Sequence, residues 1–256
     1  MNLELANLLD HFYRLMWPML RIGALLLAAP VFSLRALNTR VRVAFGLALT
    51  IMVYPMQTWP LIDPLSAVGL LEMANQITLG VLMGLMLQVV TAAVLLAGQS
   101  ISNTVGLSMA TLIDPNSGNV PVLGQFLIIL STLIFVGLGG HALLLGLLID
   151  SFSAIPIGKH LLSQQAWTGL VGWTSMIFLG GLLTALPIMV TLLFINIGLG
   201  VASRAAPALN IFSVGFPAMV IVGFVVMIAS LPHIGARTQW LWTQAFLQVR
   251  QLLGQI

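Results

Sequence analysis

Long apolar runs alternate along the chain with short polar or turn-forming stretches. Each run is continuously apolar and lacks the period-two alternation of a barrel strand, so each predicts a helix. A helix satisfies its backbone hydrogen bonds within its own segment, as lipid requires. The pattern predicts an all-α, multi-span helical protein with about six apolar segments, at Leu15–Phe32, Val43–Met56, Ile77–Gly98, Val122–Ile149, Leu170–Val201 and Ile211–Leu231.

Two of these runs have unusual lengths for a span of about 20 residues. The second is short, and the fifth is longer than one span needs. We expect the fifth run to break into two pieces at Gly180, Gly181 and Pro187.

Both ends of the chain show apolar residues at helical spacing. At the start these are Leu5, Leu8, Phe12 and Leu15, and at the finish Trp242, Phe246, Val249, Leu253 and Ile256. Two interpretations stay open: helices that lie at the lipid headgroups, or helices that dock on partner subunits.

Composition places these segments in a membrane. Of 256 residues, 59% are hydrophobic and 6% are charged, whereas a soluble domain carries about 25% charged residues. The chain is therefore predicted to be an integral membrane protein. Its orientation stays open because four basic residues fall on either side of a six-span topology, and the positive-inside rule then has no bias to weigh.

The sequence carries no catalytic or metal-binding constellation. It has no cysteine, no HExxH, no GxSxG and no glycine-rich nucleotide-binding motif. The four histidines are scattered singly, and His141 is the one that we expect inside a span, as a helix-packing hydrogen bonder in preference to a proton relay. We predict no enzymatic activity, no cofactor, no metal site and no binding of nucleic acid.

Ionisable residues inside a membrane are costly and mark functional sites. Arg21 falls within the first apolar run, whereas Glu72 and Asp150 fall at span edges where we expect water within reach. No acid falls near the centre of a span. This distribution counts against ion-coupled transport.

The polar stretch "TLIDPNSGNVP", residues 111–121, separates two strongly apolar runs. Proline, glycine and asparagine here are turn-forming residues. The preceding residues Gln99, Ser100, Ser102, Asn103 and Thr104 favour a cavity lined by water or protein. On these residues alone an exposed loop is favoured over a re-entrant constriction in a pore, which is tolerated only where it lines such a cavity.

Small residues are frequent on the predicted helices. Gly80 and Gly84 form a GxxxG step, which allows two helix backbones to approach closely. Packing within one subunit is the usual interpretation, and the number of such glycines gives modest support for a tight assembly.

Long segments of the chain resemble the FliR/SctT family of type III secretion export apparatus proteins, with the flagellar branch closer. They run from about Trp17 to Pro217 and are "WPMLRIGALLLAAPVFSLRALNTRVRVAFG", "GLSMATLIDPNSGNVPVLGQF", "LLIDSFSAIPIG" and "ALPIMVTLLFINIGLGVASRAAPALNIFSVGFP". The resemblance implies a subunit of the bacterial inner membrane, in the flagellar basal body. It also implies helical hairpins that pack with FliP-type and FliQ-type subunits into a conical helical assembly, beside FlhB-type and FlhA-type subunits.

The resemblance further implies two parts of the chain and two functional segments. Residues 1–165 would form a FliP-like half and residues 166–256 a FliQ-like hairpin with an amphipathic terminal helix. Arg204, Pro207, Asn210 and Phe212 would form an entrance rim, and Gly80, Gly84, Gly215 and Pro217 would pack helices. The implied plug of the channel consists of Met109, Ala110, Thr111, Leu112, Ile113, Asp114, Pro115, Asn116, Ser117, Gly118, Asn119, Val120, Pro121 and Val122.

The function that follows is a channel-forming subunit that passes unfolded flagellar proteins across the inner membrane, with a loop that plugs the pore. Two alternatives stay open. One is a small-solute or ion-coupled secondary transporter, which would need an inverted repeat and an ionisable pair at the midplane. The other is an assembly factor that nucleates the gate without lining its path.

Overall fold

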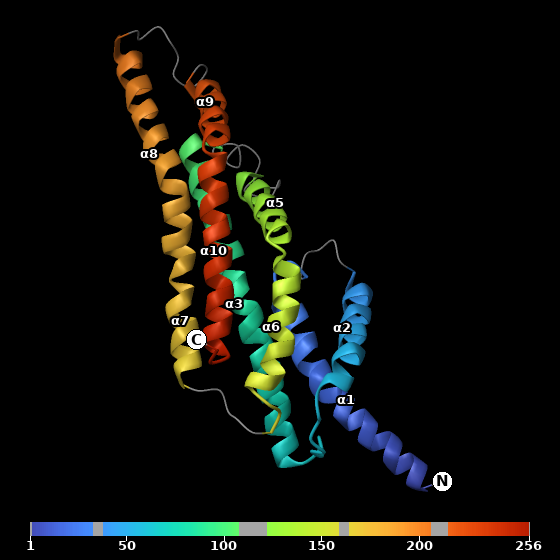
Figure 1. Ribbon diagram of the computed structural model, residues 1–256. Helices are drawn as coiled ribbons and strands as arrows, with labels where there is room; N and C mark the ends of the chain where they lie inside the picture. The colour runs from blue at the N-terminus through green and yellow to red at the C-terminus, as the bar shows by residue number, and fades with distance from the viewer. Residues whose placement is uncertain (1, 33–37, 108–121, 159–163, 206–214, 256) are drawn as a thin grey trace. The chain divides into compact units, whose positions relative to one another are not determined.

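The computed structural model describes residues 2–32, 38–107, 122–158, 164–205 and 215–255, and these residues form helices joined by short turns (Figure 1). No β-strand occurs within these ranges, and the predicted all-α fold class is confirmed. The helices are α1 Asn2–Ala28, α2 Thr39–Val53, η1 Tyr54–Met56, α3 Ala67–Val105, α5 Val122–Gly137, α6 Gly140–Ala154, α7 Gln164–Thr174, α8 Met176–Ala205, α9 Phe216–Ala229 and α10 Leu231–Leu252.

Among the described residues, two helical stretches are long and apolar enough to cross a membrane: Ala67–Val105 and Ala166–Ala202. The number rises to at most four if the broken pairs α5–α6 and α9–α10 each count as one span. The sequence pattern predicted about six. Part of the difference is α2, whose 15 residues rise only about 22 Å at ~1.5 Å per residue, short of a ~30 Å hydrocarbon core.

The breaks between helices differ from those that the sequence predicted. The run 122–149 was expected to be continuous, but it is interrupted before α6 at Gly139, which has φ of +68°. That left-handed backbone conformation ends a helix and favours glycine. The run 170–201, in contrast, continues through the predicted break at Gly180, Gly181 and Pro187, and the boundary between α7 and α8 lies earlier, at Ser175.

Gly180 and Gly181 pack a helix where a break was expected. A Cβ atom on Gly180 would lie 2.9 Å from Leu241 Cδ2, and one on Gly181 would lie 2.8 Å from the carbonyl oxygen of Ala93. The two glycines therefore allow α3 and α10 to approach α8, so the prediction of a break there is wrong.

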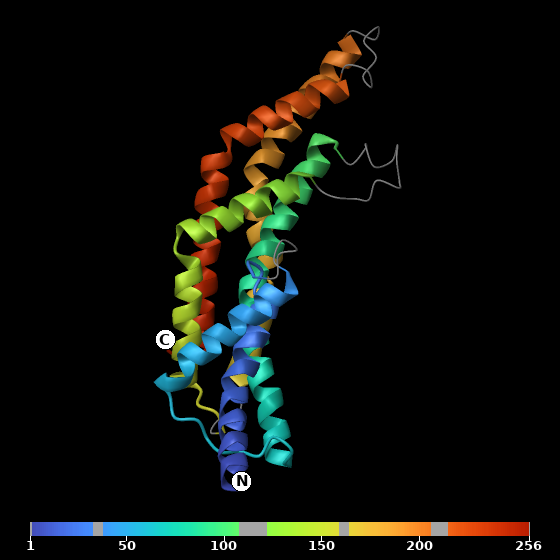
Figure 2. The same ribbon diagram turned by 90° about the vertical axis from the view of Figure 1, so that its right-hand side faces the viewer.

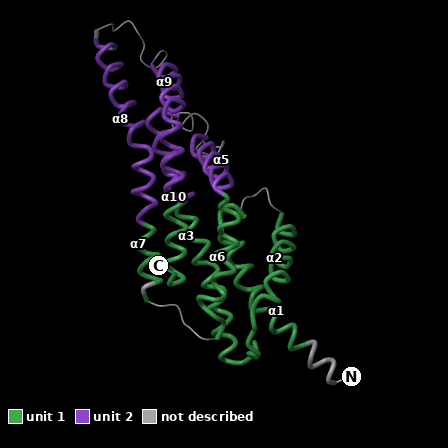
Figure 3. The backbone as a smooth tube through the Cα atoms, viewed as in Figure 1, with its two compact units in different colours: residues 1–89, 139–174, 243–256 green, residues 90–138, 175–242 purple. Residues whose placement is uncertain are grey.

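The chain divides into two compact units, each built from segments far apart in sequence (Figure 3). Unit 1 comprises residues 1–89, 139–174 and 243–256, and unit 2 comprises residues 90–138 and 175–242. Within unit 1, α1 packs on α2, as both views show (Figures 1 and 2). Its buried core includes Trp17, Ile22, Leu25, Met83 and Leu87.

Unit 2 is centred on aromatic and polar contacts of Trp242. Its ring lies 4.7 Å from that of Phe135, centroid to centroid, and its Nε1 donates to Ser131 Oγ at 3.0 Å. Ala185, Ile188 and Leu192 of α8 are fully buried in the same unit. A buried indole N–H requires such an acceptor, because leaving it unpaired is costly.

The apolar face of the terminal helix is covered by this chain itself. Trp242, Phe246, Val249 and Leu253 are all buried, and Ile256, the last residue predicted for this face, lies outside the described residues. Both interpretations of that face, as a headgroup-facing surface and as a partner-docking surface, are therefore wrong for α10. At the other end, Phe12 on α1 is 60% exposed, and both interpretations stay open there.

Candidate functional site

The most polar cluster within the described core of unit 1 surrounds Arg21 on α1, which is completely buried. Its Nε donates to Gln76 Oε1 of α3 at 2.7 Å. Its Nη1 donates to the carbonyl oxygen of Ser151 at 2.7 Å and to Ser151 Oγ at 3.0 Å, and its Nη2 donates to the carbonyl oxygen of Ile155 at 2.8 Å. All three guanidinium nitrogens thus have acceptors.

Three of those acceptors lie at the C-terminal end of α6: the carbonyl oxygen and Oγ of Ser151 and the carbonyl oxygen of Ile155. The last carbonyls of a helix have no intrahelical donor and carry partial negative charge. The guanidinium of Arg21 supplies donors and a positive charge at this end, where Ile155 is the C-terminal cap residue. Arg21 therefore joins α1 to the end of α6 as well as to α3.

Glu72 provides the negative charge that accompanies Arg21. Gln76 receives the hydrogen bond from Arg21 and donates through Nε2 to Glu72 Oε1 at 2.6 Å. Glu72 is only 6% exposed, so the expectation that water reaches it is wrong. The physical reason is that residues four apart share one helix face, and this face of α3 points toward α1.

The sequence did contain a signal for this network. Glu72 and Gln76 have the i, i+4 spacing of a polar pair, and Arg21 lies in an otherwise apolar run. Sequence spacing could not show which helix each polar residue faces.

His141 was expected inside a span, and it lies exposed at the start of α6.

Aromatic rings cover the Arg21 cluster. The guanidinium carbon lies 4.4 Å from the centroid of the Phe152 ring, within the range of a cation–π interaction. Trp59 meets Phe152 edge-on at 5.3 Å between centroids, and its Nε1 donates to the carbonyl oxygen of Tyr54 at 2.8 Å. Phe152 thus packs on the guanidinium, and Trp59 ties the segment after η1 to α6.

Gly80 and Gly84, predicted to pack helices, lie where α3 crosses α1. A Cβ on Gly80 would contact the carbonyl oxygen of Arg21, and a Cβ on Gly84 would contact Ala28. The close crossing brings Gln76, one turn before Gly80, within reach of Arg21. Gly215 and Pro217, the other predicted packing residues, lie at the start of α9 as its N-cap and in its first turn.

Residues 109–121 of the predicted plug lie outside the described residues, and its last residue, Val122, begins α5 and is 67% exposed. The helices on either side are close to one another. A Cβ on Gly98 of α3 would meet the backbone of Gly124 of α5, with its nitrogen at 2.7 Å. α3 continues for seven residues beyond this crossing, to Val105, and α5 begins two residues before it, at Val122.

The polar residues at the end of α3 behave in two ways. Gln99 and Asn103 are exposed, whereas Ser100 and Thr104 donate back to the carbonyl oxygens of Leu96 and Ser100 at 2.9 and 2.8 Å. Such back-bonding satisfies a hydroxyl within an apolar helix. Gln99 and Asn103 are one turn apart and share an open face.

Of the predicted entrance rim, one residue is described. Arg204 lies in the last turn of α8 and is exposed, so it is available to a partner. Pro207, Asn210 and Phe212 lie outside the described residues.

Comparison with known proteins defines the class. The model of the family described as bacterial export proteins, family 1, matches residues 12–245, and the chain belongs to this family. The flagellar biosynthetic protein FliR of Pectobacterium carotovorum subsp. carotovorum is 37% identical over 257 residues, which cover 99% of this chain and 96% of that protein. FliR of Escherichia coli K12 is 36% identical over 241 residues, 94% of this chain and 92% of that protein.

A more distant relative extends over the same length. FliR of Bacillus subtilis 168 is 25% identical over 255 residues, 98% of both chains. The predicted resemblance to the FliR/SctT family is therefore confirmed.

Proposed function

We propose that this chain is a channel-forming subunit of a flagellar type III protein export gate, located in the bacterial inner membrane within the flagellar basal body. It passes unfolded flagellar proteins and has no enzymatic role. The observation that carries this proposal is the family match across residues 12–245, together with relatives that are flagellar proteins over nearly their whole length.

We assign the plug of the channel to residues 109–122. The close approach of Gly98 and Gly124 supports this assignment, because it brings together the two helices from which the segment extends. A turn-rich segment held by few backbone hydrogen bonds can close a pore and be displaced by a passing chain.

The partners in this proposal are FliP-type and FliQ-type subunits in one complex, FlhB-type and FlhA-type subunits, and membrane lipid. The exposed apolar residues of α8 and α9 support a surface that other helices or lipid must cover, among them Phe194 at 70%, Val201 at 65% and Ile221 at 66% exposed. In this arrangement residues 1–165 form the FliP-like half and residues 166–256 the FliQ-like half, and Arg204 lies at the entrance rim.

One observation favours the alternative of an ion-coupled transporter. Arg21 and Glu72 form the buried ionisable pair that such a transporter would need. Against this, the guanidinium of Arg21 is held by fixed carbonyl and amide oxygens and by Phe152. A pair so fully satisfied joins three helices and leaves no open position for a transported ion.

The proposal is tested with an export substrate whose translocation is stalled by a fused, stably folded domain. A photoreactive amino acid at Asn116 should crosslink to the unfolded part of this substrate, and one at exposed Leu65 serves as the control. Co-purification with FliP-type and FliQ-type subunits must accompany the crosslink. Co-purification without any crosslink at residues 109–122 would favour the assembly factor over the channel.

A further inference from the structure

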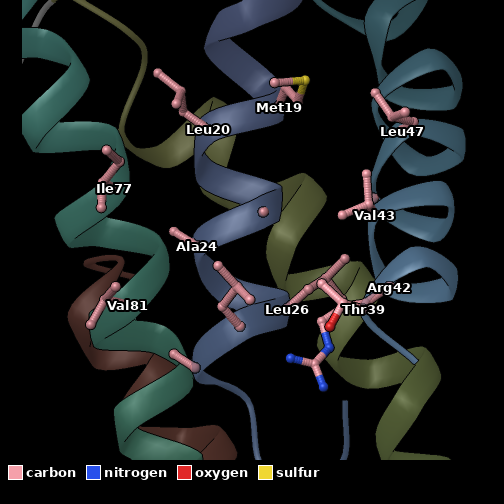
Figure 4. Close-up of a pocket in the computed structure, with 14 residues that line it drawn as sticks. Met19, Leu20, Ala24, Leu26, Thr39, Arg42, Val43, Leu47, Ile77 and Val81 are labelled. Atoms are coloured by element: carbon pink, nitrogen blue, oxygen red, sulfur yellow. The ribbon is translucent and has the colours of Figure 1, made fainter. Parts of the chain in front are cut away.

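An apolar groove with a cavity volume of about 560 Å³ runs between α1, α2 and α3 within unit 1 (Figure 4). Its walls include Leu20 and Met19 of α1, Val43 and Leu47 of α2, and Ile77 and Val81 of α3. The volume lies in the range of about 300–1,000 Å³ that is typical of small-molecule sites. The size and the walls suit a flexible hydrocarbon.

Two glycines keep the groove open. A Cβ on Gly23 of α1 would have no atom within 4 Å, and one on Gly46 of α2 would meet only Leu26 Cδ1, at 3.4 Å. Both residues line the groove. Larger side chains at Gly23 would extend into empty space, so the absence of a side chain there leaves room that the chain itself does not fill.

One end of the groove is positively charged. Arg42 and Thr39 of α2 lie together there in Figure 4, and they are the two polar residues among those described as lining the groove. The Nε of Arg42 is buried and has no hydrogen-bond acceptor. A buried donor without an acceptor is costly, so an anion or another strong acceptor at this end of the groove would stabilise it.

We propose that the groove binds one acyl chain of an anionic phospholipid, with the lipid phosphate at Arg42. A hydrocarbon tail matches apolar walls that offer no hydrogen-bond partner, and a phosphate supplies acceptor oxygens and negative charge to the guanidinium. The ligand must therefore be amphiphilic, with its anionic group at one end. Phospholipid meets this requirement and surrounds any protein with membrane-spanning helices.

Arg40 provides a charge-matched control on the same helix. It is exposed and does not line the groove described above, although with Ala44 it lines an adjoining groove that shares Thr39, Val43 and Leu47 with it. Arg40→Gln and Arg42→Gln remove the same charge two residues apart. Of these two arginines, Arg42 is the one with a guanidinium nitrogen buried without an acceptor. A general attraction of α2 to anionic lipid would instead be reduced equally in the two variants.

The test uses membranes from cells that express the full chain with its natural partners. Phosphatidylglycerol and phosphatidylcholine, each with a photoreactive diazirine in one acyl chain, are incorporated and irradiated, and the labelled residues are mapped by mass spectrometry. Labelling by phosphatidylglycerol should fall on groove residues such as Leu20, Val43 and Ile77. Arg42→Gln should reduce this labelling about fivefold, the ratio expected for one basic residue at an anionic surface, and Arg40→Gln should leave it unchanged.

A second variant tests the hydrocarbon part of the site. Gly23→Phe should reduce labelling of the groove by both lipids, because the ring occupies the open space next to α1. The proposal is overturned if wild-type labelling avoids the groove, or if both arginine variants reduce it equally. It is also overturned if a photoreactive residue at Val43 crosslinks to another protein subunit instead of lipid, since a partner helix then fills the groove. Labelling in wild-type membranes and in the two arginine variants, with the crosslink at Val43, decides these outcomes even if Gly23→Phe does not fold.

Discussion

Arg21 of α1 donates from Nε to Gln76 Oε1 of α3 at 2.7 Å, and the same guanidinium binds the carbonyl oxygens at the end of α6. A single side chain thus holds three helices that are up to 134 residues apart in sequence. Glu72, joined to Arg21 through Gln76, balances the buried charge.

The first prediction concerns this network. Arg21→Met should lower the free energy of unfolding by about 3–5 kcal/mol, because it leaves Glu72 buried without its cationic partner. Thermal unfolding of the solubilised complex measures the effect, with Arg40→Met at an exposed position of α2 as the control. Adding Glu72→Gln to Arg21→Met should restore part of the loss. If the effects of the two substitutions on the free energy of unfolding simply add, Arg21 and Glu72 are not energetically coupled.

The second prediction concerns the crossing of α1 and α3. Gly84→Ala places a methyl group against Ala28, and such overpacking should cost about 1–3 kcal/mol. Gly146→Ala on α6 is the matched control, because its Cβ meets no atom within 4 Å. In a helix interior this control should instead gain about 0.5–1 kcal/mol. Equal stability changes at the two positions would mean that the close crossing does not exist.

The third prediction concerns the helices that flank the plug. Gly98→Val should push α3 away from α5, because its Cβ and methyl groups meet the Gly124 backbone. The plug would then be anchored at two separated points and should close the channel poorly. Ion leakage across membranes that contain the assembled Gly98→Val complex should rise. Gly198→Val on α8, where a Cβ has open space, should leave ion leakage at the wild-type level. If the Gly98→Val complex does not leak ions, closure of the channel by the plug does not depend on this crossing.

The fourth prediction concerns the rim. Arg204 is exposed at the end of α8, where it suits an acidic residue, a ring of carbonyls or an anionic headgroup. Arg204→Glu should reduce swimming motility while the amount of assembled complex stays near wild type, and Arg204→Lys should retain most motility. Normal motility of Arg204→Glu would remove the support for a rim at this position.

The sequence pattern predicted the fold class but not the helix breaks. Continuous apolar runs indicate helices because lipid leaves the backbone few other solutions. A break depends on neighbours, however: Gly139 adopts a left-handed conformation that ends a helix, whereas Gly180 permits a close approach to Leu241 and leaves α8 intact. Composition alone does not distinguish these two uses of glycine.

Prediction of the candidate functional residues from the sequence was limited in the same way. Arg21 was recognisable as a charge in an apolar run, but its partners Gln76 and Ser151 lie on other helices and carry no local signature. The plug and rim assignments came from family resemblance. Turn-forming residues at 114–119 by themselves favour an exposed loop, so the physical chemistry of the segment does not select the plug.

Deletion of residues 114–119 is the most direct test of the export gate and its plug. The deletion removes turn residues and leaves α3 and α5 intact, so the complex with FliP-type and FliQ-type subunits should still assemble. The measurement is ion conductance and membrane potential in cells that produce this complex, compared with wild type. The account predicts increased conductance, a lower membrane potential and growth that is sensitive to induction. An assembled complex that remains as tight as wild type would contradict it.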